Sequence, residues 1–181
     1  MGRNYGYHAK FSGEWLDILR YELSREFPNY INMTIPSARI EYNPSDRTSY
    51  LPPVDESSWV GRLAAKLPSK PQGITIGGVI YYTPHYPNTK KKFLEAQGEE
   101  GARLYEFGMY AHEAYHALEQ ELTPNWKIFS IPMLSGKTRW FIKYVLNLIK
   151  TPNAYKHPSE IPAYEFQAKM KSLAHDTQTS R

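Results

Sequence analysis

The chain of 181 residues contains no cysteine. Disulfide bonds and thiolate metal ligands are therefore excluded, and any metal site would have to use histidine and carboxylate side chains. The absence does not decide the compartment. It suits the reducing cytoplasm, and it also suits proteins that cross membranes in an unfolded state.

Long apolar runs are also missing from the chain. No stretch of about 18 apolar residues is present, which argues against a transmembrane helix. The first residues, Met1 to His8, lack the hydrophobic segment of a secretory signal. We therefore expect a cytoplasmic location by default, with export by a specialised secretion system as the alternative. At this length the chain is expected to form one domain over residues 1–181.

A strong excess of charge of one sign is absent as well. The formal net charge is +4 at pH 7, and the one tight basic run is Lys90–Lys92. This run lies in residues 84–98, which we interpret as a connection rich in proline and lysine. Nucleic-acid binding usually needs a longer basic stripe and a recognisable module, so no nucleic-acid partner is expected.

What the sequence does contain is an HExxH motif, formed by His112, Glu113 and His116. Residues four apart lie on the same face of a helix, so both imidazoles can reach one metal ion. Residues Glu99–Glu121 contain no proline and carry apolar residues at helical spacing, and Pro124 follows, so a helix is expected there. Glu113 supplies the carboxylate that a zinc hydrolase uses as its general base.

A catalytic zinc site usually takes a third protein ligand. Downstream of His116, Glu160 stands at the start of a second expected helix, with Ser159 as its N-cap and apolar residues continuing to about Leu173. Glu160, or Glu165 further along the same helix, can reach across to the first helix. On the residue pattern alone, Glu160 is better explained as favourable negative charge near a helix N-terminus.

Further elements are expected around these two helices. Gly73–Tyr82 is rich in β-branched and aromatic residues and is interrupted by two glycines, which predicts a strand pair or a strand with a bulge. Residues 123–135 are expected to be irregular because they contain two prolines. The remaining patterns predict helices at Glu14–Leu23, Trp59–Leu67 and Trp140–Ile149 and a strand at Ser37–Tyr42.

An HExxH motif followed some tens of residues later by Glu-x-x-Ala on a second helix resembles the gluzincin metallopeptidases. The segment Glu160–Ala163 matches the second motif directly. Membrane-bound gluzincins usually continue with Asp, whereas Tyr164 here is similar to the small soluble minigluzincins and to zincin domains of bacterial toxin and secretion-cargo proteins. The segment Ile74–Tyr82 also resembles the strand that these small proteins carry before their HExxH helix. The resemblance covers Gly73–Leu173.

The resemblance implies an α+β, zincin-like fold with a small mixed sheet, whose edge strand lies beside the HExxH helix. It implies a catalytic core at residues 70–173. The residue pattern predicts an N-terminal helical and loop part at residues 1–69 and a flexible tail at residues 174–181. The resemblance also assigns roles to four side chains. Zn²⁺ would be held by His112, His116 and Glu160, and the general base would be Glu113.

These implications lead to the expectation of a zinc-dependent metallopeptidase that acts on a peptide or protein substrate. The oxyanion donor is expected close to Glu160 in the sequence, and the candidates are His157, Tyr164 and Tyr155. Two alternatives stay open at this point. In the first alternative, the chain would be a toxin effector that cleaves one specific protein. In the second, it would be a non-catalytic binding module that holds zinc.

Overall fold

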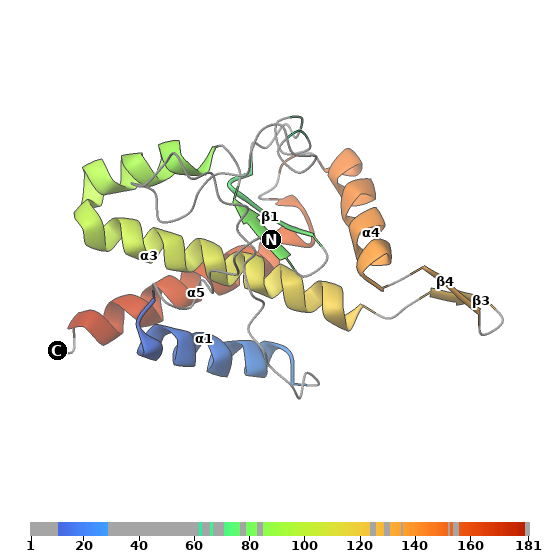
Figure 1. Ribbon diagram of the computed structural model, residues 1–181, viewed down its shortest axis with the longest axis horizontal. Coiled ribbons are helices and arrows are strands. Elements are labelled where there is room, and N and C mark those ends of the chain that lie inside the picture. Colours follow the sequence, from blue (N-terminus) through green and yellow to red (C-terminus); the bar gives the residue numbers. More distant parts are fainter. Residues whose placement is uncertain are drawn as a thin grey trace, which may run out of the picture.

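The computed structural model describes residues 11–28, 62, 66, 71–76, 79–82, 85–123, 126–128, 131–134, 136–151, 153 and 156–179. The C-terminal part of the longest helix, α3 (Tyr86–Leu122), crosses the centre of the molecule in Figure 1. The helix α5 (Glu160–Thr179) runs alongside it, and α1 (Gly13–Glu26) lies below it in this view. In chain order, the elements are α1 (Gly13–Glu26), β1 (Gly73–Ile76), β2 (Val79–Tyr82), α3 (Tyr86–Leu122), β3 (Trp126–Ile128), β4 (Ile131–Leu134), α4 (Gly136–Lys150) and α5 (Glu160–Thr179).

Helices dominate the described part of the chain, so the expectation of an α+β fold with a mixed sheet is wrong. The helices have 14, 37, 15 and 20 residues, whereas each strand has only three or four. Within the described residues, the strands form two separate antiparallel pairs, β1–β2 and β3–β4. A pair of four-residue strands covers only part of one helix face, so contacts between helices build the core.

The helix α3 begins earlier than the sequence pattern indicated. Residues 84–98 were expected to be a connection, but the chain is helical from Tyr86, with Pro87 in the first turn where its missing N–H does no harm. At Gly98 the backbone leaves the helical region, with φ 70° and ψ −169°. This conformation favours glycine, and it divides α3 into two helical segments.

The two segments of α3 pack against each other as a helical hairpin (Figure 1). The rings of Phe93 and Tyr105 stack with their centroids 4.3 Å apart. The ammonium group of Lys90 lies 2.7 Å from the carboxylate of Glu106, and the hydroxyl of Tyr86 donates a hydrogen bond to the same carboxylate. Lys90 is therefore not part of a solvated loop, because its partner Glu106 is buried.

The expected first helix is confirmed as α1, and its apolar face joins the core. Ser12 caps it, since its hydroxyl oxygen accepts a hydrogen bond from the backbone N–H of Trp15 at 3.2 Å. The ring of Trp15 lies 4.9 Å from that of Phe107 on α3, and both Leu19 and Leu23 are buried. α1 thereby packs against the second segment of α3, on the side away from β1 (Figure 1).

The helix α5 packs closely along the second segment of α3. A Cβ at Gly108 would lie 2.6 Å from side-chain carbons of Lys171, so a glycine is what allows this approach. α5 continues to Thr179, and residues 174–179, where the flexible tail was expected to begin, are helical, with Ala174 buried. The position of Glu160 is therefore set by the packing of two long helices.

The segment after α3 also differs from its expected form. Residues 123–135, expected to be irregular, contain β3 and β4, with a register shift between Trp126 and Lys127. The helix expected at Trp140–Ile149 is confirmed as α4. The strand expected at Ser37–Tyr42 lies outside the described residues, and so does nearly all of the helix expected at Trp59–Leu67. Among the helices described, none combines the length and the apolar character needed to cross a membrane.

Candidate metal centre

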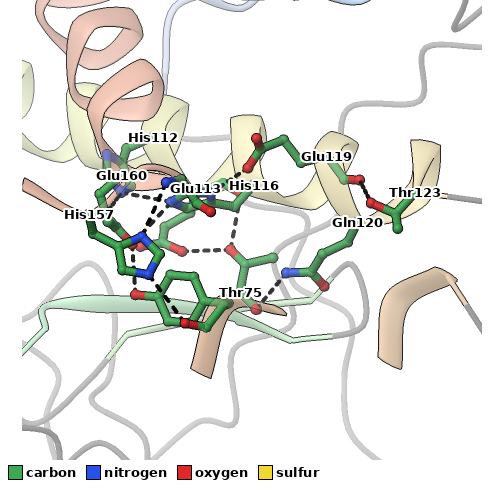
Figure 2. A network of polar contacts seen from close by, with 11 residues as sticks. Thr75, His112, Glu113, His116, Glu119, Gln120, Thr123, His157 and Glu160 are labelled. Carbon is green, nitrogen blue, oxygen red and sulfur yellow. Dashed lines mark hydrogen bonds and ion pairs between the residues drawn. The ribbon is translucent and has the colours of Figure 1, made fainter. Parts of the chain in front are cut away.

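The two histidines of the HExxH motif and Glu160 come together in a buried cluster (Figure 2). His112 and His116 lie one turn apart on α3, and their Nε2 atoms are 3.2 Å apart. Glu160, in the first turn of α5, places Oε2 3.1 Å from Nε2 of His112 and Oε1 3.5 Å from Nε2 of His116. The three residues are 6%, 4% and 7% exposed, so solvent does not screen the cluster.

The cluster fits a metal ion in both its spacing and its donor atoms. Ligands at about 2.0–2.1 Å from a tetrahedral zinc ion stand about 3.3 Å from one another. The separations found here, 3.1, 3.2 and 3.5 Å, lie around that value. Two imidazoles and one carboxylate are a donor set of catalytic zinc sites, which keep a fourth position for water. Glu165, the alternative third ligand, is exposed on α5 and does not belong to the cluster.

The first turn of α5 is capped by His157, whereas Ser159 was expected in that role. The backbone carbonyl of His157 accepts hydrogen bonds from the N–H groups of Glu160 at 2.9 Å and Ile161 at 3.1 Å. Its Nδ1 accepts another from the N–H of Ser159 at 3.1 Å. A histidine side chain here does what Ser or Asp usually does at a helix start, because an unprotonated ring nitrogen is also an acceptor.

The ring of His157 is consequently committed to backbone groups. Since Nδ1 accepts, Nε2 carries the proton and donates it to the backbone carbonyl of Tyr144 at 3.2 Å. His157 is also fully buried. The prediction that His157 donates to an oxyanion is therefore not supported by its placement, because neither nitrogen is directed at the ligand cluster. Tyr155, the third candidate, lies outside the described residues.

Electrostatics keep Glu160 ionised. Burial disfavours its charged form, but hydrogen bonds with His112 and His116 outweigh burial and hold the pKa of the carboxyl well below its usual range. The position of Glu160 in the first turn of α5 acts in the same direction, because the positive end of the helix dipole stabilises a carboxylate. Glu160 is thus suited to remain an anionic ligand at every pH near neutrality.

The imidazole of His116 is oriented from behind by Glu119. Nδ1 of His116 lies 3.0 Å from Oε2 of Glu119, which fixes a proton on Nδ1 and turns Nε2 toward the cluster. Burial lowers the pKa of His116, but the hydrogen bonds with Glu119 and Glu160 outweigh it and raise the pKa to about 10. His112 differs, since among the described residues its Nδ1 has no hydrogen-bond partner.

Glu113 is held by the strand β1 (Figure 2). The hydroxyl of Thr75 lies 2.6 Å from Oε2 of Glu113 and 3.0 Å from its backbone carbonyl. A Cβ at Gly73 would lie 2.8 Å from the carboxyl carbon of Glu113, so the carboxylate occupies the space that this glycine leaves open. Gln120, one helical turn past His116, donates from Nε2 to the carbonyl of Thr75 at 2.8 Å and ties β1 to α3.

The pKa of Glu113 is shifted in the direction that suits proton exchange. Burial raises the pKa of this carboxyl, and the neighbouring His112 and His116 offset part of the rise. The two carboxylates of the site are therefore tuned in opposite directions. The pKa of Glu160 is lowered, which stabilises it as an anion, whereas burial raises the pKa of Glu113.

The helix α4 contributes two aromatic residues that sequence reasoning did not place in the site. The hydroxyl of Tyr144 donates a hydrogen bond to Oε1 of Glu160 at 2.7 Å. The ring of Trp140 lies 5.5 Å from that of His116 and stacks on Tyr144, with an interplanar angle of 15°. Burial, followed by the charge of Glu160, raises the pKa of Tyr144 well above its usual value, so its hydroxyl stays protonated and can donate.

The signal for these residues was present in the sequence, because Trp140 and Tyr144 are four apart and share one face of α4. The sequence pattern had placed them only in an expected helix at Trp140–Ile149, with no role in the site. Tyr164, which was named from the sequence as a candidate oxyanion donor, lies beside the cluster. Its ring is half-buried, with its centroid 4.7 Å from that of His112.

Comparisons with protein families, with curated proteins and with solved structures gave no match for this chain. The gluzincin resemblance therefore rests on the two motifs and on the geometry of the cluster that they form.

Proposed function

We propose that the chain is a zinc-dependent peptidase of gluzincin type. The observation that carries this proposal is the convergence of His112, His116 and Glu160, with the carboxylate of Glu113 beside them. A zinc ion held by the three ligands would activate a water molecule and polarise the scissile carbonyl group. The donor set favours a catalytic role over a structural one, because three protein ligands leave a position open.

Glu113 is the general base in this proposal. Its carboxylate accepts a proton from the water as the new C–O bond forms, and it returns a proton to the leaving amine as the C–N bond breaks. Its raised pKa supports this role, because a group that both accepts and returns a proton works best when its pKa is close to the pH of the solution. Thr75 and Gly73 keep the carboxylate in one orientation during both transfers.

Tyr164 is the residue that we assign to the oxyanion. Its ring packs beside that of His112, and it stands one turn after Glu160 on the same helix. A hydroxyl donor positioned there would stabilise the negative charge that develops on the carbonyl oxygen. Tyr144 is less suited, because its hydroxyl already donates to Glu160.

A peptide is the substrate class that the surroundings of Glu113 favour. The hairpin β1–β2 lies directly beside the base, and a strand can bind an extended peptide by main-chain hydrogen bonds without demanding a particular sequence. Gln120 already occupies the carbonyl of Thr75, so pairing with a substrate falls to the other main-chain groups of the hairpin.

Digestion of a peptide library, read by mass spectrometry, tests this function. The zinc-loaded chain should cleave library peptides, a chelator should stop cleavage, and the variant Glu113→Gln should keep its zinc while losing turnover by on the order of 10³-fold or more. Equal cleavage by Glu113→Gln would remove the base from the mechanism. Zinc binding with no cleavage of any peptide or protein would instead favour the non-catalytic binding module, and cleavage of one protein alone would favour the toxin effector.

A further inference from the structure

Both oxygens of Glu160 face the histidine pair, which leaves the manner of its ligation open. Oε2 lies 3.1 Å from Nε2 of His112, and Oε1 lies 3.5 Å from Nε2 of His116. A carboxylate that used both oxygens would fill one more coordination position than a carboxylate that used one. In a site with three protein ligands, that extra position is the one needed for water or substrate.

The two oxygens differ in one respect. Oε1 accepts the hydrogen bond from the hydroxyl of Tyr144 at 2.7 Å, whereas Oε2 has its nearest described partner in the imidazole of His112. We propose that Tyr144 is a positioning residue that engages Oε1 and leaves Oε2 as the single ligand atom of Glu160. This inference rests on the proposed metal site, and it adds the residue that would keep the site open.

The placement of Tyr144 is itself strongly constrained. Its ring stacks on Trp140 with the centroids 5.2 Å apart and packs against the ring of His157 at 4.6 Å. Its backbone carbonyl accepts the hydrogen bond from Nε2 of His157, and His157 caps the turn that carries Glu160. Tyr144 and Glu160 are therefore joined twice, through the hydrogen bond between their side chains and through His157, which links α4 to the first turn of α5.

The variant Tyr144→Phe removes the hydroxyl and keeps the ring packing, so it isolates this hydrogen bond. Cobalt(II) in place of zinc supplies the readout, because its visible absorption is intense when four-coordinate and weakens as coordination number rises. In the variant, Oε1 is released and can join the ion, so the visible bands should lose intensity. Metal affinity, measured by competition with a chelator, should also fall by roughly 10- to 100-fold, as for other partners of metal ligands.

The matched control is Tyr115→Phe, which makes the same chemical change on a tyrosine whose ring lies 6.4 Å from that of His116 and which has no assigned role. It should leave the cobalt spectrum and the metal affinity of the wild type unchanged. Far-ultraviolet circular dichroism verifies that both variants keep their helices. A spectrum and an affinity in Tyr144→Phe equal to those of the wild type would overturn the inference alone. Failure of the wild-type chain to bind cobalt or zinc would overturn the proposed function instead.

Discussion

The two sides of the candidate site are built from different structural elements. The proposed metal ligands stand on α3 and α5, and Tyr144 on α4 donates a hydrogen bond to one of them, so helix packing determines where they lie. Glu113, the proposed base, is on the same helix as two of the proposed ligands, but its carboxylate is held by the hairpin β1–β2, through Thr75 and the space at Gly73. Metal binding and proton transfer should therefore be separable by mutation.

The electrostatics follow the same division. Hydrogen bonds with the two histidines keep Glu160 anionic, which is what a ligand requires. Burial raises the pKa of Glu113, which is what a group that takes up and releases a proton requires. Two carboxylates in one site with their pKa values pushed apart are a recurring sign of divided roles in enzymes. The comparison predicts that changes on the hairpin side spare the metal and impair turnover.

Among changes to the residues that hold Glu113 in place, Gly73→Ala should have the largest effect on turnover. A Cβ at this position meets the carboxyl group of Glu113, so the base must move. A displacement of about 1 Å can cost on the order of 10²-fold in rate, and we expect kcat to fall by that order with zinc content unchanged. Gly13→Ala, where a Cβ meets nothing within 4 Å, is the control. Loss of zinc in Gly73→Ala would contradict the claim that metal binding and proton transfer are separable by mutation.

The substitution Thr75→Val should have a smaller effect of the same kind. It removes the hydrogen bond to Oε2 of Glu113 and keeps the shape of the side chain. A hydrogen bond to a charged group contributes about 1.5–3 kcal/mol, so kcat should fall roughly 10- to 100-fold while KM and zinc content stay the same. Thr75→Ser restores the hydroxyl and should recover most of kcat. If Thr75→Ser is as slow as Thr75→Val, the hydroxyl is not what positions the base.

Zinc binding should release a proton from the ligand side. Without metal, the hydrogen bonds of His116 with Glu119 and Glu160 raise its pKa to about 10, so the ring is protonated at neutral pH. A metal ligand must be unprotonated, so binding expels about one proton, and the apparent zinc affinity should rise about tenfold per pH unit until pH approaches 10. Calorimetry in buffers of different ionisation enthalpy measures the released proton.

The control for this measurement is Glu119→Gln, which removes the negative charge that supports protonated His116. The rise in zinc affinity should then level off at a lower pH. The raised pKa of His116 also makes the stability of the metal-free fold depend on pH. Its contribution to stability is fully present below pH 6.5 and is lost as pH rises through 10. Zinc binding without proton release at pH 7–8 would contradict this account of His116.

The smallest effect on the site is expected from Gly98→Ala, at the kink of α3. The backbone of Gly98, with φ 70° and ψ −169°, lies in a region essentially restricted to glycine, and this costs alanine about 1–3 kcal/mol. A Cβ there meets no other atom within 4 Å, so the cost is conformational. Urea denaturation should give a free energy of unfolding lower by that amount, and zinc bound per folded chain should not change. A drop in zinc content in folded protein would mean that the helical hairpin also shapes the site.

The site was more predictable from sequence than the architecture around it. The spacing of His112 and His116 needs only a helix to bring the rings together, and α3 meets that condition. Glu160 needed a second helix in the right place, which no local pattern specifies, so the family pattern supplied that choice over Glu165. Tyr144 was missed because an aromatic residue in an apolar stripe is indistinguishable in sequence from one that only packs.

Other expectations depended on tertiary contacts that the pattern did not contain. Residues 84–98 were interpreted as a connection from their proline and lysines, yet Phe93 and Lys90 find partners on the other segment of α3. The strand pair at Gly73–Tyr82 was predicted correctly from its β-branched residues. Its extension into a mixed sheet came from the resemblance and is wrong, since the described strands form two isolated antiparallel pairs.

The metal content of purified protein tests the central claim most directly. Elemental analysis by mass spectrometry should find about one zinc per chain in the wild type, as expected for a three-ligand site. The variants His116→Ala and Glu160→Ala should lose it, whereas Glu165→Ala, changed at an exposed position of the same helix, should keep it. Stoichiometric zinc in His116→Ala or in Glu160→Ala would contradict the ligand set on which the whole account depends.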